Sequence, residues 1–257
     1  MAMVFQTNTI LQLPQHQALL AEFFFATLAS YNFHWLMGNA YRQGEFSVKS
    51  LLQSPTALVL WFIGVIGTVV FFIPSGINFW MACVAGVLTL SYSIPLLPIQ
   101  QFHWLRKPGI LKTLLLPFSW AVVTVLLPLG KIDAILQLPV LALFVHRCCF
   151  VFILCVIFDN RDIAVDKING LHSLSTDWLP WKIHLLVIVA LLVLLGLNVY
   201  IPVTPASIYL QLSLHCTVLV TGIVYLYALK KRGYLFYYFI TDGMMLFSTI
   251  LTTLATI

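Results

Sequence analysis

Three aspartates, Asp159, Asp162 and Asp166, have the side chains and the spacing in this sequence best suited to chemistry. The chain has eight acidic residues, and four of them stand at positions 159, 162, 166 and 177. If one helix continues through residue 166, the three carboxylates fall within roughly a 60° arc over about 10 Å of axis. Like charges at this spacing repel, and Mg²⁺, which accepts one or two carboxylates together with water and substrate phosphates, offsets the repulsion. We therefore expect Asp159, Asp162 and Asp166 to hold Mg²⁺.

A solvated helix end is the alternative interpretation of the same run. Arg161 and Lys167 lie within it and supply ion pairs without any metal. The composition favours the metal, because only 8% of the residues are charged, against about 25% in an average soluble domain. In a chain with so few carboxylates, their clustering favours a bound cation over a solvated helix end.

The elements that must position these aspartates are membrane-spanning helices. Apolar residues make up 61% of the chain, and long apolar stretches recur from end to end. Each is long enough to cross about 30 Å of hydrocarbon as a helix. We expect an all-α, polytopic helical bundle that forms a single membrane domain over residues 1–257. The predicted spans, about eight in number, are 17–38, 56–74, 77–98, 113–130, 134–158, 181–202, 206–229 and 234–256.

Basic residues gather in alternate connections between these spans, which predicts the orientation of the chain. Such connections stay cytoplasmic, where they also meet anionic lipid headgroups, so the positive charge argues for membrane lipids and not for nucleic acid. We expect a multi-pass protein of the bacterial inner (plasma) membrane with the aspartates facing the cytoplasm. The basic connections carry Arg42 and Lys49; Arg106, Lys107 and Lys112; Arg161, Lys167 and Lys182; and Lys230, Lys231 and Arg232.

The first thirteen residues have two interpretations. They lack the basic flank and the small-residue cleavage site of a signal peptide. Either they form an extracytoplasmic stub, or they are the end of a ninth helix that begins upstream. We favour the second interpretation.

The string Asp159-Asn160-Arg161-Asp162-Ile163-Ala164-Val165-Asp166-Lys167, followed by Gly170 and Leu174, closely resembles the second aspartate motif of the UbiA superfamily of intramembrane prenyltransferases. Tyr92-Ser93-Ile94-Pro95 and the basic residues after it resemble the tyrosine, proline and cytoplasmic loop of the same enzymes. The resemblance implies a bundle of about nine helices with a lateral cavity open to lipid. It also implies Mg²⁺-dependent transfer of a prenyl group from a polyprenyl diphosphate donor to an aromatic or lipid acceptor.

The chemistry implied by the resemblance gives each polar residue a role. Breaking the allylic C–O bond develops negative charge on the leaving diphosphate, which metal ions and basic side chains stabilise. Asp159, Asp162 and Asp166 are then both catalytic residues and metal ligands. The residues expected to bind the substrate are Asn32, Tyr92, Arg106, Lys107, Lys112, Arg161 and Lys167.

One departure from the family concerns its first aspartate motif, which opens with asparagine and carries two carboxylates. Asn32 matches the opening asparagine, but Phe33 and Leu36 stand where the carboxylates are expected. That metal site has lost its hard anionic ligands. The alternative function is therefore a catalytically degenerate UbiA-like membrane protein that binds a prenyl or lipid diphosphate without turnover.

Two further charged residues, Arg147 and Asp242, fall inside predicted spans. Charged side chains are costly in lipid and are functional or paired by default. At 1.5 Å per residue they lie about 18 Å and about 12 Å from the cytoplasmic ends of their helices, a difference that an arginine side chain covers. We expect an Arg147–Asp242 ion pair, with a polar cavity floor as the alternative.

Overall fold

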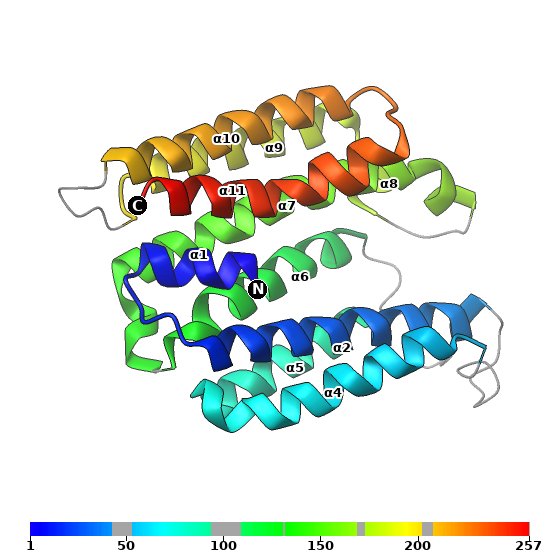
Figure 1. Cartoon of the computed structure of the whole chain (residues 1–257). Helices are drawn as coiled ribbons and strands as arrows, with labels where there is room; N and C mark the ends of the chain where they lie inside the picture. Colours follow the sequence, from blue (N-terminus) through cyan, green and yellow to red (C-terminus); the bar gives the residue numbers. More distant parts are fainter. Residues whose placement is uncertain (43–52, 94–108, 131, 169–172, 202–207, 257) are drawn as a thin grey trace. The chain divides into compact units, whose positions relative to one another are not determined.

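The computed structural model describes residues 1–42, 53–93, 109–130, 132–168, 173–201 and 208–256. Every regular element in these ranges is helical and none is a strand, so the predicted all-α class is confirmed. The chain divides into two compact units (Figure 1). Residues 15–107 with Met1 form the first unit, and residues 2–14 and 108–257 form the second. The single domain predicted over residues 1–257 stays a prediction.

The first unit consists of α2 (Gln17–Arg42), α4 (Pro55–Ser75) and α5 (Phe79–Ser93), with α2 packed along α4 and touching α5. Proline is favoured in the first turn of a helix, where its missing N–H costs no hydrogen bond, and α4 begins with Pro55. The helix ends at Ser75 and is capped by Gly76, whose φ of 70° is the left-handed conformation that glycine adopts without strain. Local sequence therefore sets both ends of α4.

Two glycines of α4 permit the close approach of α2. A Cβ atom added at Gly64 would lie 2.6 Å from the backbone nitrogen of Ala29, and one added at Gly67 would overlap the ring of Phe25. Small residues at helix interfaces in membranes allow backbones to pack this closely through van der Waals contact. The packing of α2 on α4 thus depends on the absence of side chains at these two positions.

Replacement of Gly64 by alanine should lower the free energy of unfolding by about 1–3 kcal/mol, because the added methyl group meets backbone atoms that cannot rotate away. Chemical unfolding in detergent micelles measures this loss. Gly86→Ala in α5 is the matched control, since a Cβ there meets no atom within 4 Å. It should be neutral or slightly stabilising, as glycine is a poor residue in a helix interior. Equal losses in the two variants would contradict the close-approach explanation.

The second unit is built around α7 (Leu138–Ile168), which packs against α6, α9 and α10 (Figure 1). α1 packs against α11, which in turn packs against α10. The other elements of the unit are α1 (Ala2–Ile10), α6 (Gly109–Ala121), the π-helix η3 (Val122–Leu126), the 3₁₀ turns η4 (Leu127–Leu129) and η5 (Ile132–Leu136), α8 (Leu174–Asp177), α9 (Pro180–Leu197), α10 (Ile208–Ala228), the π-helix η6 (Phe236–Thr241) and α11 (Asp242–Leu254).

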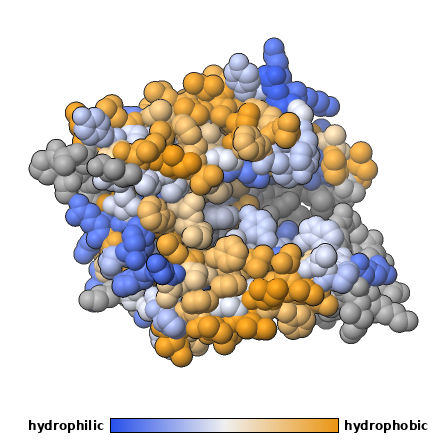
Figure 2. All heavy atoms as spheres, viewed as in Figure 1, coloured by the Kyte–Doolittle hydropathy of each residue, from blue (hydrophilic) through white to orange (hydrophobic). Residues whose placement is uncertain are grey.

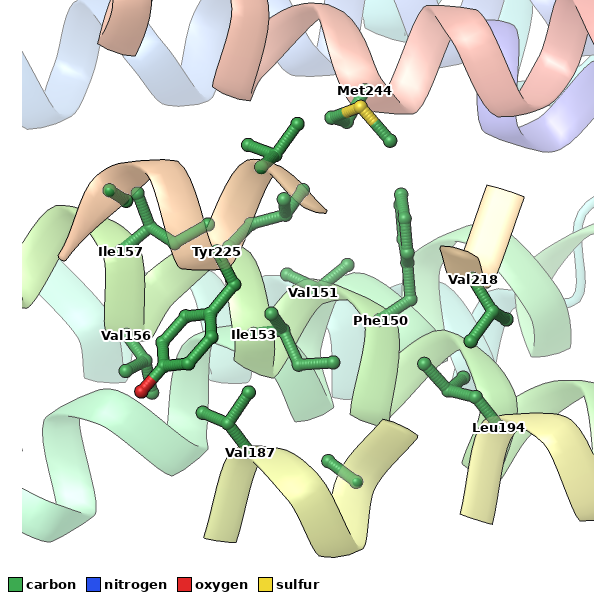
Figure 3. Close-up of a cluster of buried hydrophobic side chains, with 14 of the residues drawn as sticks. Phe150, Val151, Ile153, Val156, Ile157, Val187, Leu194, Val218, Tyr225 and Met244 are labelled. Atoms are coloured by element: carbon green, nitrogen blue, oxygen red, sulfur yellow. The ribbon is translucent and has the colours of Figure 1, made fainter. Parts of the chain in front are cut away.

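The core of the second unit is a cluster of buried apolar side chains from α7, α9, α10 and α11. Apolar side chains from the four helices interdigitate there (Figure 3). In lipid, where the surroundings are as apolar as the side chains, such packing stabilises through van der Waals contact more than through exclusion of water. The labelled residues are Phe150, Val151, Ile153, Val156 and Ile157 of α7, Val187 and Leu194 of α9, Val218 and Tyr225 of α10, and Met244 of α11.

Four helices, α4, α7, α9 and α10, are long and apolar enough to cross a membrane. In α4 and α9 only 17% and 22% of the most apolar window is buried, against 67% in α7. The first two therefore present most of their apolar side chains outward, whereas other helices enclose α7. Figure 2 shows apolar side chains gathered over α4 and α10. These helices indicate a membrane protein.

Helical residues also occur within each of the other predicted spans. The apolar helices at 79–91 and 113–129 are shorter than a full membrane crossing. The helices α2 and α11 overlap the remaining two predicted spans, 17–38 and 234–256. The count of about eight spans, the nine-helix UbiA arrangement and the cytoplasmic side of the aspartates stay predictions.

Candidate functional site at the end of α7

The predicted site lies on the last turns of α7. This helix has Pro139 in its first turn and no further proline or glycine before it ends at Ile168, so nothing in its sequence interrupts it. At 1.5 Å per residue, Asp159 lies about 31 Å from Leu138 along the axis, which is about the thickness of the hydrocarbon layer. Because α7 continues beyond residue 166, Asp159, Asp162 and Asp166 occupy one stripe of it, as the sequence predicts.

Asp159 is held by a side chain from another helix. Thr113 of α6, which is buried, donates a hydrogen bond from Oγ1 to Oδ2 of Asp159 over 2.7 Å. Hydrogen bonds to an ionised acceptor are shorter and stronger than those between neutral groups. The contact fixes the orientation of the Asp159 carboxylate and joins the start of α6 to the end of α7.

Asp162 forms a two-pronged ion pair with its neighbour Arg161. Nε of Arg161 donates to Oδ1 over 2.6 Å, and Nη2 donates to Oδ2 over 2.7 Å. The side chains of Arg161 and Asp162 remain 25% and 39% exposed, so both can reach a ligand from solvent.

Three aromatic rings surround the guanidinium of Arg161, and we call them the aromatic box: Phe158, Tyr237 and Tyr238. The Cζ atom of Arg161 lies 4.9 Å from the ring centre of Phe158, 5.4 Å from that of Tyr237 and 5.0 Å from that of Tyr238. All three distances are within the range of cation–π attraction. Phe158 stands one turn before Arg161 on α7, while the two tyrosines come from the π-helix η6.

Asp166 differs from the other two aspartates because it is buried, whereas Asp159 and Asp162 are half-buried. Across the described ranges, no three or more His, Cys, Asp or Glu side chains are grouped to hold a metal ion. Asp159 and Asp162 alone still fit Mg²⁺, which needs only one or two carboxylates when water and phosphate complete its shell. Their hard oxygen donors lie one helical turn apart and are suitable for that ion, although Arg161 binds both oxygens of Asp162 in this structure. A role for Asp166 as a third ligand stays a prediction.

The predicted substrate-binding residues are dispersed. Lys167 is exposed on the last turn of α7, close to the aspartates in sequence. Asn32 belongs to the first unit, where its Nδ2 donates to the carbonyl oxygen of Leu28 in the same helix over 2.8 Å. The remaining ones lie outside the described part of the chain: Arg106, Lys107 and the side chains of Tyr92 and Lys112.

A second polar cluster lies inside the second unit, between α1, α7 and α11. Arg147 is only 3% exposed, and its Nη1 donates to Oε1 of Gln6 over 2.7 Å, while Nη2 donates to Oγ1 of Thr7 over 3.3 Å. Nε2 of Gln6 in turn donates to Oγ of Ser248 and to Oγ1 of Thr252, both over 2.8 Å. Neutral oxygen atoms therefore solvate this buried guanidinium.

The predicted Arg147–Asp242 ion pair is wrong. Asp242 is exposed at the start of α11 and lies close enough to Arg161 for their charges to interact. The reason lies in the packing of α1 on α11, which brings Gln6 to the position beside Arg147 that we expected Asp242 to fill.

Sequence reasoning missed the groups that surround the aspartates and Arg147. Thr113 and Gln6 give no local signal, since a single threonine or glutamine in an apolar helix has no distinctive spacing. The aromatic box had a signal in the run from Tyr234 to Phe239, which is rich in tyrosine and phenylalanine and follows a basic connection. Only the fold shows that this run lies against Arg161.

Comparisons of the chain with protein-family models, with curated proteins and with solved structures return no match. The resemblance of residues 159–167 and 92–95 to the UbiA motifs stays a prediction.

Proposed function

We propose that this chain is a multi-pass membrane enzyme that transfers a prenyl group from a polyprenyl diphosphate to a small or lipid acceptor, in a reaction that requires Mg²⁺. The observation that carries the proposal is the position of Asp159 and Asp162, about one hydrocarbon thickness along a continuous apolar helix. A prenyl diphosphate has a long apolar tail and a charged head, which match the apolar length of this helix and the aspartates at its end. The resemblance of residues 159–167 to the UbiA motif supplies the reaction.

The side chains around the aspartates are suited to the charges that such a reaction creates. Asp159 and Asp162 would hold Mg²⁺, which would neutralise the negative charge that develops on the leaving diphosphate. Thr113 keeps the carboxylate of Asp159 oriented through its 2.7 Å hydrogen bond. Arg161 and Lys167 supply positive charge to phosphate oxygens, and arginine binds phosphate with two parallel hydrogen bonds.

The aromatic box suits the other product of bond breaking, the allylic cation. Ring faces attract positive charge, and Phe158, Tyr237 and Tyr238 accept the allylic cation once Arg161, whose guanidinium they surround in the free protein, has turned toward the diphosphate. Apolar rings also keep water from reaching the cation before the acceptor does. The resemblance suggests an aromatic ring or a lipid as the acceptor, and the apolar setting is compatible with either.

Binding without turnover is the second candidate function, and two observations favour it. The carboxylate of Asp162 is already occupied by Arg161, and Phe33 and Leu36 stand where the family carries its other metal ligands. A protein with these features retains charge for a diphosphate head and lacks one of the two metal sites.

The test is diphosphate release from purified protein in liposomes, with farnesyl, geranylgeranyl and longer prenyl diphosphates as donors. A lipid extract and small aromatic compounds serve as acceptors. We expect release with Mg²⁺, its loss with EDTA and its return when Mg²⁺ is added back, because the developing charge needs the ion. Mg²⁺-dependent binding of the donor without release would favour the second candidate. If the protein neither binds the donor nor releases diphosphate, both candidate functions are excluded.

A further inference from the structure

We propose that Arg161 is a latch on Asp162: without a ligand it occupies the carboxylate, and a bound diphosphate draws it away so that the carboxylate can accept a divalent cation. This inference rests on the proposed function, in which Asp162 is a metal ligand. It adds an order of events, since phosphate and metal then bind cooperatively and the metal site stays closed until the donor arrives.

The first support is that helix geometry does not provide the Arg161–Asp162 contact. Adjacent residues on a helix point about 100° apart and do not face each other, whereas residues three or four apart do. The side chain of Arg161 must therefore fold around the helix to reach both oxygens of Asp162 at 2.6 and 2.7 Å. A contact of this kind needs something that holds the arginine in place.

The aromatic box is what holds it. Its rings lie within 4.9–5.4 Å of Cζ and come from two elements, α7 and η6. Side chains packed against the guanidinium limit the rotamers of Arg161, so the arginine loses less conformational entropy when its guanidinium binds the carboxylate. The latch is thus built by tertiary contacts between α7 and η6.

One donor of Arg161, its Nη1 atom, has no hydrogen bond of good geometry to the described residues, although the hydroxyl of Tyr238 lies near the guanidinium. This atom is buried, while Nε and Nη2 are both used by Asp162. A buried donor on a charged group that lacks a good hydrogen bond costs free energy, so the closed arrangement is incompletely satisfied. A diphosphate presents several strong acceptor oxygens and can engage the fork and this donor together.

The exchange of partners couples the two ligands. Diphosphate removes Arg161 from Asp162, which raises the affinity of Asp162 for metal, and by linkage the metal raises the affinity for diphosphate by the same factor. A variant that lacks the latch should therefore bind metal tightly even without diphosphate.

The test measures Mn²⁺ affinity by electron paramagnetic resonance on purified protein in micelles, with no diphosphate present. Arg161→Gln should bind Mn²⁺ about tenfold more tightly than the wild type, because it frees both oxygens of Asp162 and also removes a positive charge that repels the metal ion. Lys167→Gln is the matched control, since it removes one positive charge from the same helix end without freeing Asp162. It should change the affinity by less than about threefold, as expected for an exposed charge.

A second variant keeps Arg161 but loosens the aromatic box. Tyr238 is 47% exposed, so Tyr238→Leu should fold, and it removes one ring from the guanidinium. We expect it to tighten Mn²⁺ binding to a smaller extent than Arg161→Gln. In Arg161→Gln combined with Asp162→Asn, the tight binding should disappear.

The outcomes separate the latch from the proposed function. Equal tightening by Arg161→Gln and Lys167→Gln would overturn the latch and leave only a general charge effect. Mn²⁺ binding that is lost in Asp162→Asn but unchanged in Arg161→Gln would overturn the latch and keep the metal site. Absence of Mn²⁺ binding in every variant would overturn the latch and the proposed metal site together.

Discussion

Asp162→Asn should lower Mg²⁺-dependent diphosphate release by about 100- to 1,000-fold, the range seen when one stabilising group of a transition state is removed. Asparagine keeps the size and shape of the side chain but removes the charge that binds Mg²⁺ and one of its two hard oxygen donors. Single-turnover release from a labelled prenyl diphosphate measures the chemical step without interference from product dissociation. A titration of Mg²⁺ should show that excess metal restores little of the rate.

Asp133→Asn is the control for this variant. Asp133 is exposed in η5, just before the opposite end of α7, and the substitution makes the same chemical change in the same unit. It should release diphosphate at the wild-type rate. If Asp162→Asn released diphosphate at more than about a tenth of the wild-type rate, Asp162 would not be a catalytic residue, because the loss of a metal ligand should lower the rate by more than about tenfold.

Gln6→Leu should destabilise the protein by about 3 kcal/mol, the largest stability effect that we expect from one side chain. The substitution removes the 2.7 Å acceptor of Arg147 and leaves a guanidinium that is 3% exposed with fewer partners. A buried charge whose partner is removed costs several kcal/mol, because it has neither water nor a hydrogen bond in exchange. Chemical unfolding in detergent micelles gives the free energy of unfolding.

The double variant Gln6→Leu with Arg147→Met should recover most of that loss. Replacing a whole buried polar group by apolar side chains of similar size is often neutral, since no charge is left unsatisfied. Arg232→Met is the control, as Arg232 is exposed and its loss should change stability by about 0.5 kcal/mol or less. If Gln6→Leu alone cost under 1 kcal/mol, or if the double variant were the least stable of the set, the explanation of the cluster would be wrong.

The path of α7 and the stripe of aspartates were predictable from the sequence, for a physical reason that is local. A helix satisfies its own backbone hydrogen bonds, so an apolar run with no glycine, and with no proline beyond its first turn, becomes helical whatever surrounds it in the membrane. The spacing of Asp159, Asp162 and Asp166 then fixes their relative directions on the helix. The all-α class, the apolar helices and the common face of the three aspartates follow in the same way.

Tertiary packing decided which side chains meet the charged ones. Arg147 contacts Gln6, which is 141 residues away in the chain, and Asp159 contacts Thr113, which is 46 residues away. Local spacing gives no information about such pairs, because they depend on how helices pack side by side. The same holds for Arg161, where η6 supplies two of the three rings. The sequence by itself therefore determined the apolar helices and the positions of the charges along them. Packing decided which polar groups those charges contact, because a charge buried in an apolar interior must be hydrogen-bonded to polar groups that folding brings within reach.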